Sequence, residues 1–285
     1  MSLIKFNNFS FRYKGNEDYA LRDIDLKIDS NKFILLAGET GSGKTSLIRC
    51  MNGLIPQFYA GFYKGSVEIA GKNAALTPIA DLSTQVGIVF QNPENQLIAM
   101  NVEHEIAFGM ENLGLSRESI KESIENVVKL TEISHLLDKA PFELSGGEQQ
   151  RVAIASILVL NPKIIILDEP TASLDPFFAQ KIILLLKRIQ KEQEVTIIIS
   201  EHRMDLVLPL IDEIILIDKG KIIAHDIKGE VINSEKFKRL HINKPIIFSI
   251  FNQLKKYNIF ENKIPTSIEE ILLALRNIDI KFGEM

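Results

Sequence analysis

The chain has little cysteine, no excess of basic charge and no long apolar run, and each shortage excludes a class of protein. The single cysteine, Cys50, leaves no disulfide to be formed within the chain. Asp and Glu number 37 against 33 Lys and Arg, so we expect no generally basic surface and no nucleic acid partner. No apolar stretch approaches the roughly 18–20 residues that span a bilayer, and no signal peptide is recognised. We therefore expect a cytosolic protein whose apolar residues, 46% of the chain, form its core.

What the chain does contain is a glycine-rich phosphate loop. Residues 38–45 follow the apolar run 33–37 and precede a predicted helix from about Lys44 to Asn52. Glycines let consecutive N–H groups point at phosphate oxygens, lysine adds a mobile cation, and threonine offers a hydroxyl to Mg²⁺. The helix dipole favours the same anion. An ordinary glycine-rich turn is the alternative. We predict that ATP or another nucleoside triphosphate is bound by Gly38, Glu39, Thr40, Gly41, Ser42, Gly43, Lys44 and Thr45.

A second motif is an apolar run that ends in two carboxylates. Residues 164–167 are typical of a strand buried on both faces of a parallel sheet. Asp168 and Glu169 follow where such a strand ends, which is where open α/β sheets hold ligands. Two carboxylates at a strand end are often merely solvated, but the phosphate loop favours catalysis. We predict that Asp168 binds the metal, directly or through water, and that Glu169 deprotonates the water attacking the γ-phosphate.

The third motif, Leu-Ser-Gly-Gly-Glu-Gln-Gln-Arg at residues 144–151, precedes a helical stretch over 152–160. Ser145 is a predicted N-cap, and Gly146 and Gly147 leave bare N–H groups at a helix start, which makes a second anion site. A chain with two such sites either uses both on one ligand or lends one to a neighbour. An ordinary capped helix would explain Ser145 but not the two glycines.

With these motifs, residues 1–225 resemble the ATP-binding-cassette (ABC) ATPases, whose signature is the Leu-Ser-Gly-Gly string. The resemblance implies that Ser145, Gly146 and Gly147 of one subunit close over the ATP held by a second subunit, so that two chains sandwich two ATP molecules head to tail. It also implies an α/β fold: a P-loop NTPase (RecA-like) core sheet, an antiparallel β subdomain and an α-helical signature subdomain at about 92–160.

The same resemblance implies roles for further residues. Gln91 would reach Mg²⁺ and the attacking water, Asp175 would lie in a loop that contacts the partner subunit, and His202 would sense the γ-phosphate. Tyr13 would stack on adenine, with Tyr19 as a rival and a plain core or surface tyrosine as the alternative for both.

Two positions depart from the family pattern. Glu148 stands where glutamine is more usual, and Glu201 stands before His202 where threonine or serine is usual. Neither departure removes a group that binds phosphate or metal, although Glu201 could alter coupling or the protonation of His202. We expect the other histidines to be surface or structural: His104, His135, His225 and His241.

The order of elements favours a parallel sheet with right-handed crossovers. Residues 2–37 and 66–70 are predicted to be short strands of the antiparallel part, and residues 81–90 to lead a strand to Gln91. Helical periodicity runs from about Gln96 to Leu160. Further strands are predicted at 163–168, 195–199, 213–218 and 221–225, with a helix from about Pro176 to Lys191.

Four segments, at 53–56, 90–97, 105–109 and 112–115, are similar to those of energy-coupling factor (ECF) transporter ATPases, the cobalt, nickel and vitamin uptake systems. The resemblance implies a peripheral subunit at the cytoplasmic face of the membrane. Its partners would be a second ATPase subunit, an integral-membrane coupling protein and a small substrate-binding membrane protein. A groove beside Gln91 would receive a helix of the membrane partner, and a packed helical-subdomain surface is the alternative.

The tail, residues 226–285, is predicted to be a small helical appendage. Residues 245–254 suggest an amphipathic helix, and residues 266–270 carry a capping-box pattern before a second one. We expect the appendage either to hold two ATPase subunits together or to fold back on its own core.

Two other functions remain open at this stage. A soluble ABC ATPase acting on DNA or ribosomes would usually carry two cassettes, coiled coils or zinc-binding cysteine pairs. A nucleotide kinase would need an acceptor-binding lid and no Leu-Ser-Gly-Gly string.

Overall fold

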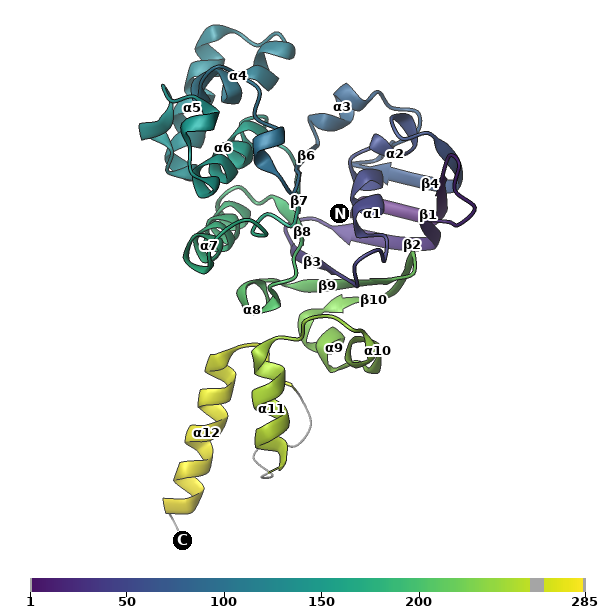
Figure 1. The fold of residues 1–285 in the computed structure, drawn as a ribbon, viewed down its shortest axis with the longest axis vertical. Helices are drawn as coiled ribbons and strands as arrows, with labels where there is room; N and C mark the ends of the chain where they lie inside the picture. Colours follow the sequence, from purple (N-terminus) through teal and green to yellow (C-terminus); the bar gives the residue numbers. More distant parts are fainter. Residues whose placement is uncertain (1, 257–263, 284–285) are drawn as a thin grey trace.

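Two β-sheets organise the computed structural model, which describes residues 2–256 and 264–283 (Figure 1). The larger sheet has six strands in the order β10-β9-β3-β8-β7-β6, parallel except for β10. Its strands are β3 (Phe33–Ala37), β6 (Val86–Val89), β7 (Ile164–Asp168), β8 (Thr196–Ser200), β9 (Glu213–Asp218) and β10 (Lys221–Ile227). Every residue of β3, β7 and β8 is buried, as expected for central parallel strands.

The smaller sheet is antiparallel, in the order β2-β1-β4-β5. It comprises β1 (Ser2–Tyr13), β2 (Leu21–Asp29), β4 (Gly61–Ile69) and β5 (Lys72–Asn73). One expectation is wrong here: residues 33–37 belong to the parallel sheet, because their side chains are apolar and buried on both faces. Another needs refinement, since a short helix, α3 (Ile79–Ser83), occupies the start of the segment expected to lead the strand before Gln91.

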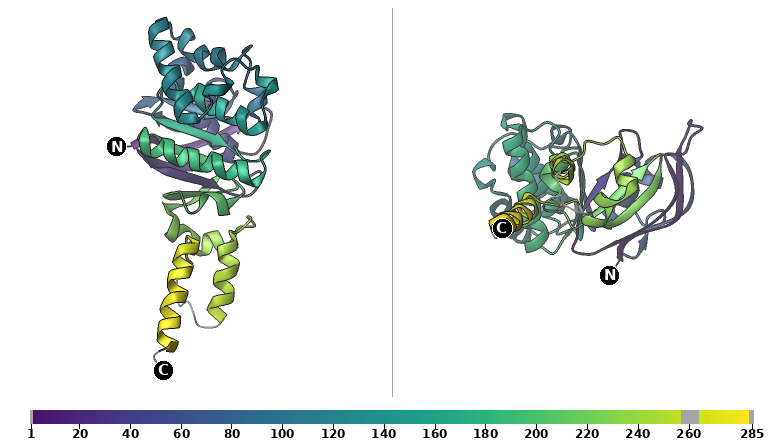
Figure 2. Two further views of the ribbon diagram at one scale, coloured as in Figure 1. Left: turned by 90° about the vertical axis from the view of Figure 1, so that its left-hand side faces the viewer. Right: turned by 90° about the horizontal axis from the view of Figure 1, so that it is seen from below.

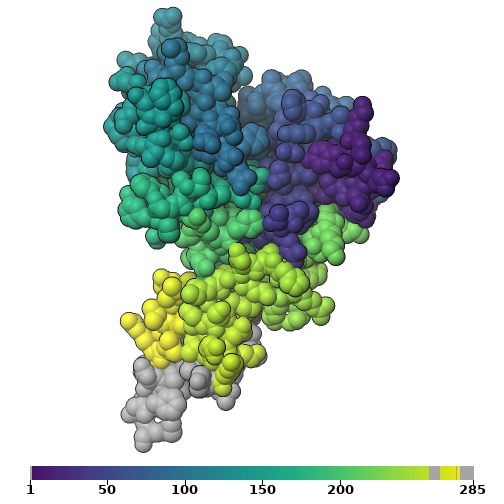
Figure 3. All heavy atoms as spheres, viewed as in Figure 1, coloured from purple at the N-terminus to yellow at the C-terminus, as the bar shows by residue number. Residues whose placement is uncertain are grey.

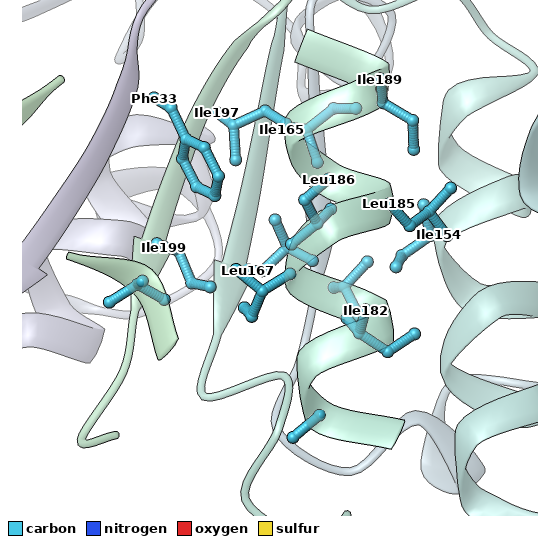
Figure 4. Packing of buried hydrophobic residues seen from close by; sticks show 14 of the residues in the cluster. Phe33, Ile154, Ile165, Leu167, Ile182, Leu185, Leu186, Ile189, Ile197 and Ile199 are labelled. Carbon is cyan, nitrogen blue, oxygen red and sulfur yellow. The ribbon is translucent and has the colours of Figure 1, made fainter. Parts of the chain in front are cut away.

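The side chains on the two faces of the larger sheet belong to two different hydrophobic cores. Ile34, Ile164 and Ile198 face the antiparallel sheet together with helix α1 (Lys44–Met51). Phe33 and its neighbours on the other face pack against α7 (Pro176–Glu192), whose Ile182, Leu186 and Ile189 lie over Ile165, Leu167 and Ile197 (Figure 4). The parallel sheet is therefore covered on both faces, which the alternating strands and helices predict.

The helical subdomain lies beside β6 and packs on the α7 side of the sheet (Figure 1). Its longest helix, α5, is capped by Ser116, whose Oγ accepts the Ser119 N–H at 3.3 Å. The described helices before α7 other than α1 are α2 (Leu54–Gln57), α3 (Ile79–Ser83), η1 (Pro93–Asn95), α4 (Val102–Asn112), α5 (Arg117–Thr131), η2 (Ser134–Leu136), η3 (Pro141–Glu143) and α6 (Gly146–Leu158).

The C-terminal extension packs against the cassette through its first two helices and the start of the third. Its last two helices project away from the cassette. Val231 and Phe237 are buried in the core shared with α7, as are Ile247 and Phe251 of α11. Beyond them α11 and α12 run side by side away from the sheets (Figures 1 and 2), and the space-filling view shows the extension projecting from the rest of the molecule (Figure 3). The helices after α7 are α8 (Met204–Val207), α9 (Lys228–Asn233), α10 (Glu235–Arg239), α11 (Ile246–Lys256) and α12 (Ile268–Gly283).

The capping pattern before α12 is present, with Ser267 as the cap. Ser267 Oγ accepts the Glu270 N–H at 3.2 Å, and the Glu270 carboxylate accepts the Thr266 N–H at 2.7 Å. Within residues 2–256 and 264–283, no helix is both long enough and apolar enough to span a bilayer.

Candidate nucleotide site

The predicted phosphate and catalytic residues come together at the carboxyl edge of the parallel sheet. The phosphate loop follows β3, His202 follows β8, Glu169 follows β7, and Gln91 follows β6. These four strands are neighbours in the order β3-β8-β7-β6. Segments far apart in the sequence therefore meet at one edge, the usual ligand position in open α/β sheets.

The phosphate loop needs its glycines because other backbone atoms approach it closely. A Cβ on Gly38 would lie 2.3 Å from the carbonyl oxygen of Ile217, and one on Gly43 would lie 2.8 Å from that of Ala20. Gly43 also has a φ of 109°, which L side chains rarely adopt. Ser42 Oγ is buried without a hydrogen-bond partner among the described residues, so the loop holds a polar group that a phosphate oxygen could satisfy.

Lys44 is held inside the loop. Its side chain is buried, and Nζ donates to the carbonyl oxygens of Gly38 at 2.9 Å and Glu39 at 3.0 Å. Burial lowers the pKa of Lys44, while the negative charges of Glu169 and Asp168 oppose that shift. The residue is thus a positioned ammonium group with carboxylates nearby.

Thr45 and Asp168 supply oxygen atoms suited to a hard cation. Thr45 Oγ1 donates to Asp168 Oδ2 at 3.1 Å, and the Ser200 hydroxyl donates to Asp168 Oδ1. The described residues contain no group of three or more His, Cys, Asp and Glu that would hold an ion by themselves. A hydroxyl and one carboxylate fit Mg²⁺, which commonly takes few protein ligands and completes its shell with phosphate and water.

Glu169 is clamped between two predicted site residues. Its Oε1 lies 3.0 Å from His202 Nε2, and its Oε2 accepts a hydrogen bond from Gln91 Nε2 at 3.0 Å. The backbone of Glu169 has a φ of 50°, a left-handed conformation held by bonds from its N–H to Ser200 O and Oγ, both at 3.0 Å. This arrangement points one carboxylate at the nucleotide pocket and fixes both of its oxygens.

A hollow of about 380 Å³ opens beside the phosphate loop. Besides loop residues and Glu169, its walls include Tyr19, Arg22 and Lys219, and the last two were not anticipated. Arg22 comes from β2 and Lys219 from the β9–β10 turn, so only the fold brings them to the phosphate loop. The turn is anchored there, because the Gly220 N–H donates to Ser42 O at 2.8 Å.

The structure leaves two tyrosines near this hollow. Tyr19 lines it, whereas Tyr13 lies behind Ser46, with its hydroxyl 3.0 Å from Ser46 Oγ and accepting a bond from Arg49 at 3.1 Å. Tyr13 also packs edge-on against Phe11 and Tyr59. The rival position therefore gains support, and the adenine contact stays a prediction for either ring.

Two predicted groups have unexpected partners. The Glu39 side chain turns away from the hollow, and its Oε1 accepts the His241 N–H at 2.8 Å, which lowers the pKa of the carboxyl. His241, expected to be uninvolved, thereby links the C-terminal extension to the phosphate loop. Glu39 still contributes its carbonyl oxygen to Lys44.

The signature residues lie elsewhere on the molecule. Ser145 and Gly146 are exposed, and neither they nor Gly147 line the phosphate hollow. They start α6, on the opposite face of the parallel sheet from α1 (Figure 1). Gly147 is packed so closely that a Cβ would lie 3.1 Å from the Phe178 ring.

Glu148, the first departure from the family pattern, completes a capping box. Its Oε2 accepts the Ser145 N–H at 2.8 Å and the Ser145 hydroxyl at 2.7 Å, and the hydroxyl bond is the main reason that the pKa of Glu148 is lowered. Asp175 plays a similar part for α7, since its Oδ1 accepts the N–H groups of Phe177 and Phe178 at 2.9 and 3.1 Å. Ser145 and Asp175 are both exposed, and the side-chain bonds of each stay within its own helix start.

Comparisons with known proteins agree with this architecture. A sequence model of the ABC transporter family matches residues 21–172. The energy-coupling factor transporter ATP-binding protein EcfA2 of Caldanaerobacter subterraneus is 41% identical over 261 residues, which are 90% of this chain and 90% of that protein.

Solved structures extend the agreement to the fold. The structure of cbiO1 from Clostridium perfringens, part of the ABC transporter complex cbiONQ, is 32% identical with a TM-score of 0.75 and covers 90% of this chain and 97% of its own. The ATP-binding cassette MJ0796, in a dimeric post-hydrolysis structure with ADP and Pi, is 28% identical with a TM-score of 0.67. The match covers 79% of this chain and 99% of MJ0796.

Proposed function

Because the chain belongs to the ABC transporter family of ATPases, we propose that it is the ATP-hydrolysing subunit of an energy-coupling factor-type importer. In this role it powers uptake of a vitamin or a transition-metal ion through membrane partners and works as a peripheral subunit at the cytoplasmic face. The likeness to EcfA2 and cbiO1 supports the choice of transporter type. The cassette spans residues 1–225 and the extension residues 226–285.

One observation carries the proposal: a single chain holds two half-sites that do not meet. The phosphate loop, Asp168 and Glu169 surround one hollow, while Ser145 and Gly147 are tied to the opposite face of the sheet. Ser145 and Gly146 are exposed at the start of α6, where the helix end favours an anion, and the phosphate loop of the same chain lies elsewhere. A second ATPase subunit, identical or related, supplies what each half lacks, and MJ0796 is an example of a dimeric cassette.

The proposed reaction uses groups that are already in place. Lys44 and the loop N–H groups bind the β- and γ-phosphates, and the partner's signature covers the opposite side of the nucleotide. Glu169 takes the proton from the attacking water, while Gln91 and His202 hold its two oxygens. Thr45, Asp168 and Gln91 would hold Mg²⁺, which when bound neutralises charge developing on the phosphates. Closure of the two subunits excludes other water.

The surface beside Gln91 is a candidate for the membrane partner. Phe90, Ile98 and Met100 are exposed there, and Phe108 of α4 is half exposed. The segment is not loose, because Gln96 bonds to both Phe90 N and Ile88 O, and Glu105 accepts the N–H groups of Ile98 and Ala99 at 2.8 Å. A fixed set of exposed apolar side chains next to a catalytic group suits a helix that moves with the ATPase cycle.

The extension packs in part on its own core and also leaves apolar side chains exposed. Its first helices and one face of α11 pack on their own core, yet Ile246, Ile268, Leu272 and Leu273 remain more than half exposed. We propose that these side chains meet the extension of the paired ATPase. Changing Leu272 and Leu273 to Ser should weaken the nucleotide-free dimer in sedimentation, whereas Leu76→Ser, at an even more exposed site outside the extension, should not. An unchanged dimer would remove this part of the proposal.

The central test is the concentration dependence of hydrolysis. The rate per chain should rise with concentration for the isolated protein and saturate once dimers form, because each site needs two chains. Full turnover by a strictly monomeric preparation would overturn the shared site. Purification from membranes with attached proteins should also recover an integral-membrane subunit and a small substrate-binding one, and recovery of ribosomes or DNA instead would favour the soluble alternative.

A further inference from the structure

Glu201 is a buried carboxylate to which the proposed chemistry gives no task. The residue is 6% exposed and stands between β8 and the sensor His202. Its Oε2 accepts the Thr171 hydroxyl at 2.6 Å, and its Oε1 accepts the backbone N–H groups of His202 at 2.9 Å and Arg203 at 3.0 Å. A buried carboxylate with its oxygens satisfied in this way is a firm structural link, since losing one partner would strand a charge.

The two sides of this link lead to different parts of the mechanism. On one side the bonds fix the backbone turn that carries His202, whose ring reaches Glu169. On the other side Thr171, itself fully buried, begins the loop that leads from Glu169 to Asp175. The link is reinforced, because Arg203 Nη1 donates to Leu174 O at 2.9 Å and the Glu169 N–H donates to Ser200 O.

The loop that ends at Asp175 also supports the signature. Leu174 lies under the start of α6, 3.5 Å from the position of a Cβ on Gly146, and Phe178 of α7 packs against Gly147. Helix α7 in turn packs tightly between the sheet and α6 (Figure 4). A displacement of the 201–203 turn would therefore shift the start of α6, which is the surface proposed to face the second subunit.

We propose that Glu201 is a positioning residue that couples the His202 turn of one chain to its 171–175 loop, so that the state of one nucleotide site is transmitted to the site across the dimer. The coupling rests on the proposed two-subunit arrangement. A threonine or serine at position 201 has a single, shorter oxygen and could not bridge both sides, so the glutamate gives this chain a tighter connection.

The first experiment uses Thr171, which is fully buried and does not line the phosphate hollow. In the full complex, Thr171→Val removes the hydroxyl and leaves Glu201 Oε2 unpaired, while Thr171→Ser keeps the hydroxyl and is the matched control. We expect kcat to fall roughly tenfold in Thr171→Val, the order for losing a charge-assisted hydrogen bond, with the KM for ATP unchanged and Thr171→Ser near normal. Equal activities of the two variants would overturn the proposal.

The second experiment separates an effect within one chain from an effect across the dimer. Two differently tagged copies are co-expressed, and mixed dimers are isolated in which one copy carries Lys44→Ala. The remaining working site then uses the normal copy's phosphate loop and the Lys44→Ala copy's signature and 171–175 loop. Adding Glu201→Ala to the Lys44→Ala copy should slow that site, and adding Glu201→Gln, which can still bridge the two sides, should slow it less.

The outcomes distinguish the two levels of the proposal. An unslowed site in the Glu201→Ala mixed dimer would overturn the coupling and leave the shared site standing. A mixed dimer that keeps half the normal rate when its Lys44→Ala copy also carries Gly147→Ala would instead overturn the shared site itself, because the normal copy would then need no signature but its own. Circular dichroism of each variant checks that a lost rate is not lost folding.

Discussion

The two halves of the nucleotide site are built in opposite ways. In the phosphate-loop half, Glu169, Gln91, His202 and Lys44 hold one another or the loop through side-chain bonds. In the signature half, Ser145 and Asp175 bond only within their own helix starts and face solvent. The contrast indicates that the first half is held in place by contacts between distant segments of one chain, while the second half is an exposed surface that we propose acts on another chain.

The largest effect should come from breaking the first half at Lys44. Lys44→Ala removes the only buried cation of the described phosphate loop, so ATP binding itself should fall below detection, measured by titration with a fluorescent nucleotide. Lys219→Ala, on the rim of the same hollow, is the matched control and should retain binding. Equal losses in both would show that general positive charge, not the loop position, binds the phosphates.

Glu169→Gln should separate binding from chemistry within that half. The amide can still contact Gln91 and His202 but cannot take a proton, so hydrolysis should slow by about 10²–10⁴ while ATP remains bound. Phosphate release and nucleotide retention measured on the same sample check this. Normal turnover would place the base on another residue.

Gly147→Ala should impair the signature half of the site and leave the phosphate-loop half unchanged. Its Cβ would press on the Phe178 ring at 3.1 Å, and overpacking of about 1–3 kcal/mol predicts a loss of hydrolysis of roughly 10–100-fold with ATP binding intact. Mixing this variant with Lys44→Ala should restore one working site per dimer. If mixing restored nothing, the signature would act on its own chain, and the contrast between the halves would fail.

A smaller effect should reveal which tyrosine meets the base. Stacking of about 1 kcal/mol predicts a loss of ATP affinity of about fivefold for the correct Tyr→Ala change. Tyr19→Ala should show it if the residue lining the hollow stacks, and Tyr13→Ala if the ring behind Ser46 does. Phenylalanine at each position is the control that keeps the ring. A preference for ATP over tripolyphosphate that survives both alanine changes would exclude both rings.

The smallest effect should be a gain in the ATP affinity of dimer closure, caused by removing the charge of Glu148. Glu148 places a negative charge beside the Ser145 hydroxyl that is expected to meet the partner's phosphates. Glu148→Gln removes the charge and should lower the ATP concentration for half-maximal dimer closure by roughly twofold, in the range of exposed charge effects. Closure can be followed by light scattering in the Glu169→Gln background. A higher midpoint would mean that the capping box matters more than repulsion.

The parts of the site that the sequence predicted are those with local patterns. Three features can be recognised from a few consecutive residues, and the structure has all three. They are the loop at 38–45, the strand that leads to Asp168 and Glu169, and the cap at Ser145. The strand order places His202 and Gln91 against Glu169, a contact that the sequence did not predict, while their chemical roles stay predictions.

The missed parts depend on contacts between distant segments. Arg22, Lys219 and His241 approach the loop only because β2, the β9–β10 turn and the extension pack around it, and none of them carries a local signal. Glu201 is recognisable from the sequence as a departure that could alter coupling, but its partner Thr171 lies 30 positions away and carries no local signal. The error at 33–37 had a different cause: this run is apolar throughout, as a central parallel strand is, but it follows directly on the antiparallel strands in the sequence.

The fixed segment that presents Phe90, Ile98 and Met100 has a practical consequence for handling the protein. An exposed apolar surface on an ordered segment cannot be buried by a local rearrangement. The protein should therefore tend to aggregate when it is produced without its membrane partners. Production together with those partners, or in mild detergent, should give a higher yield than production alone.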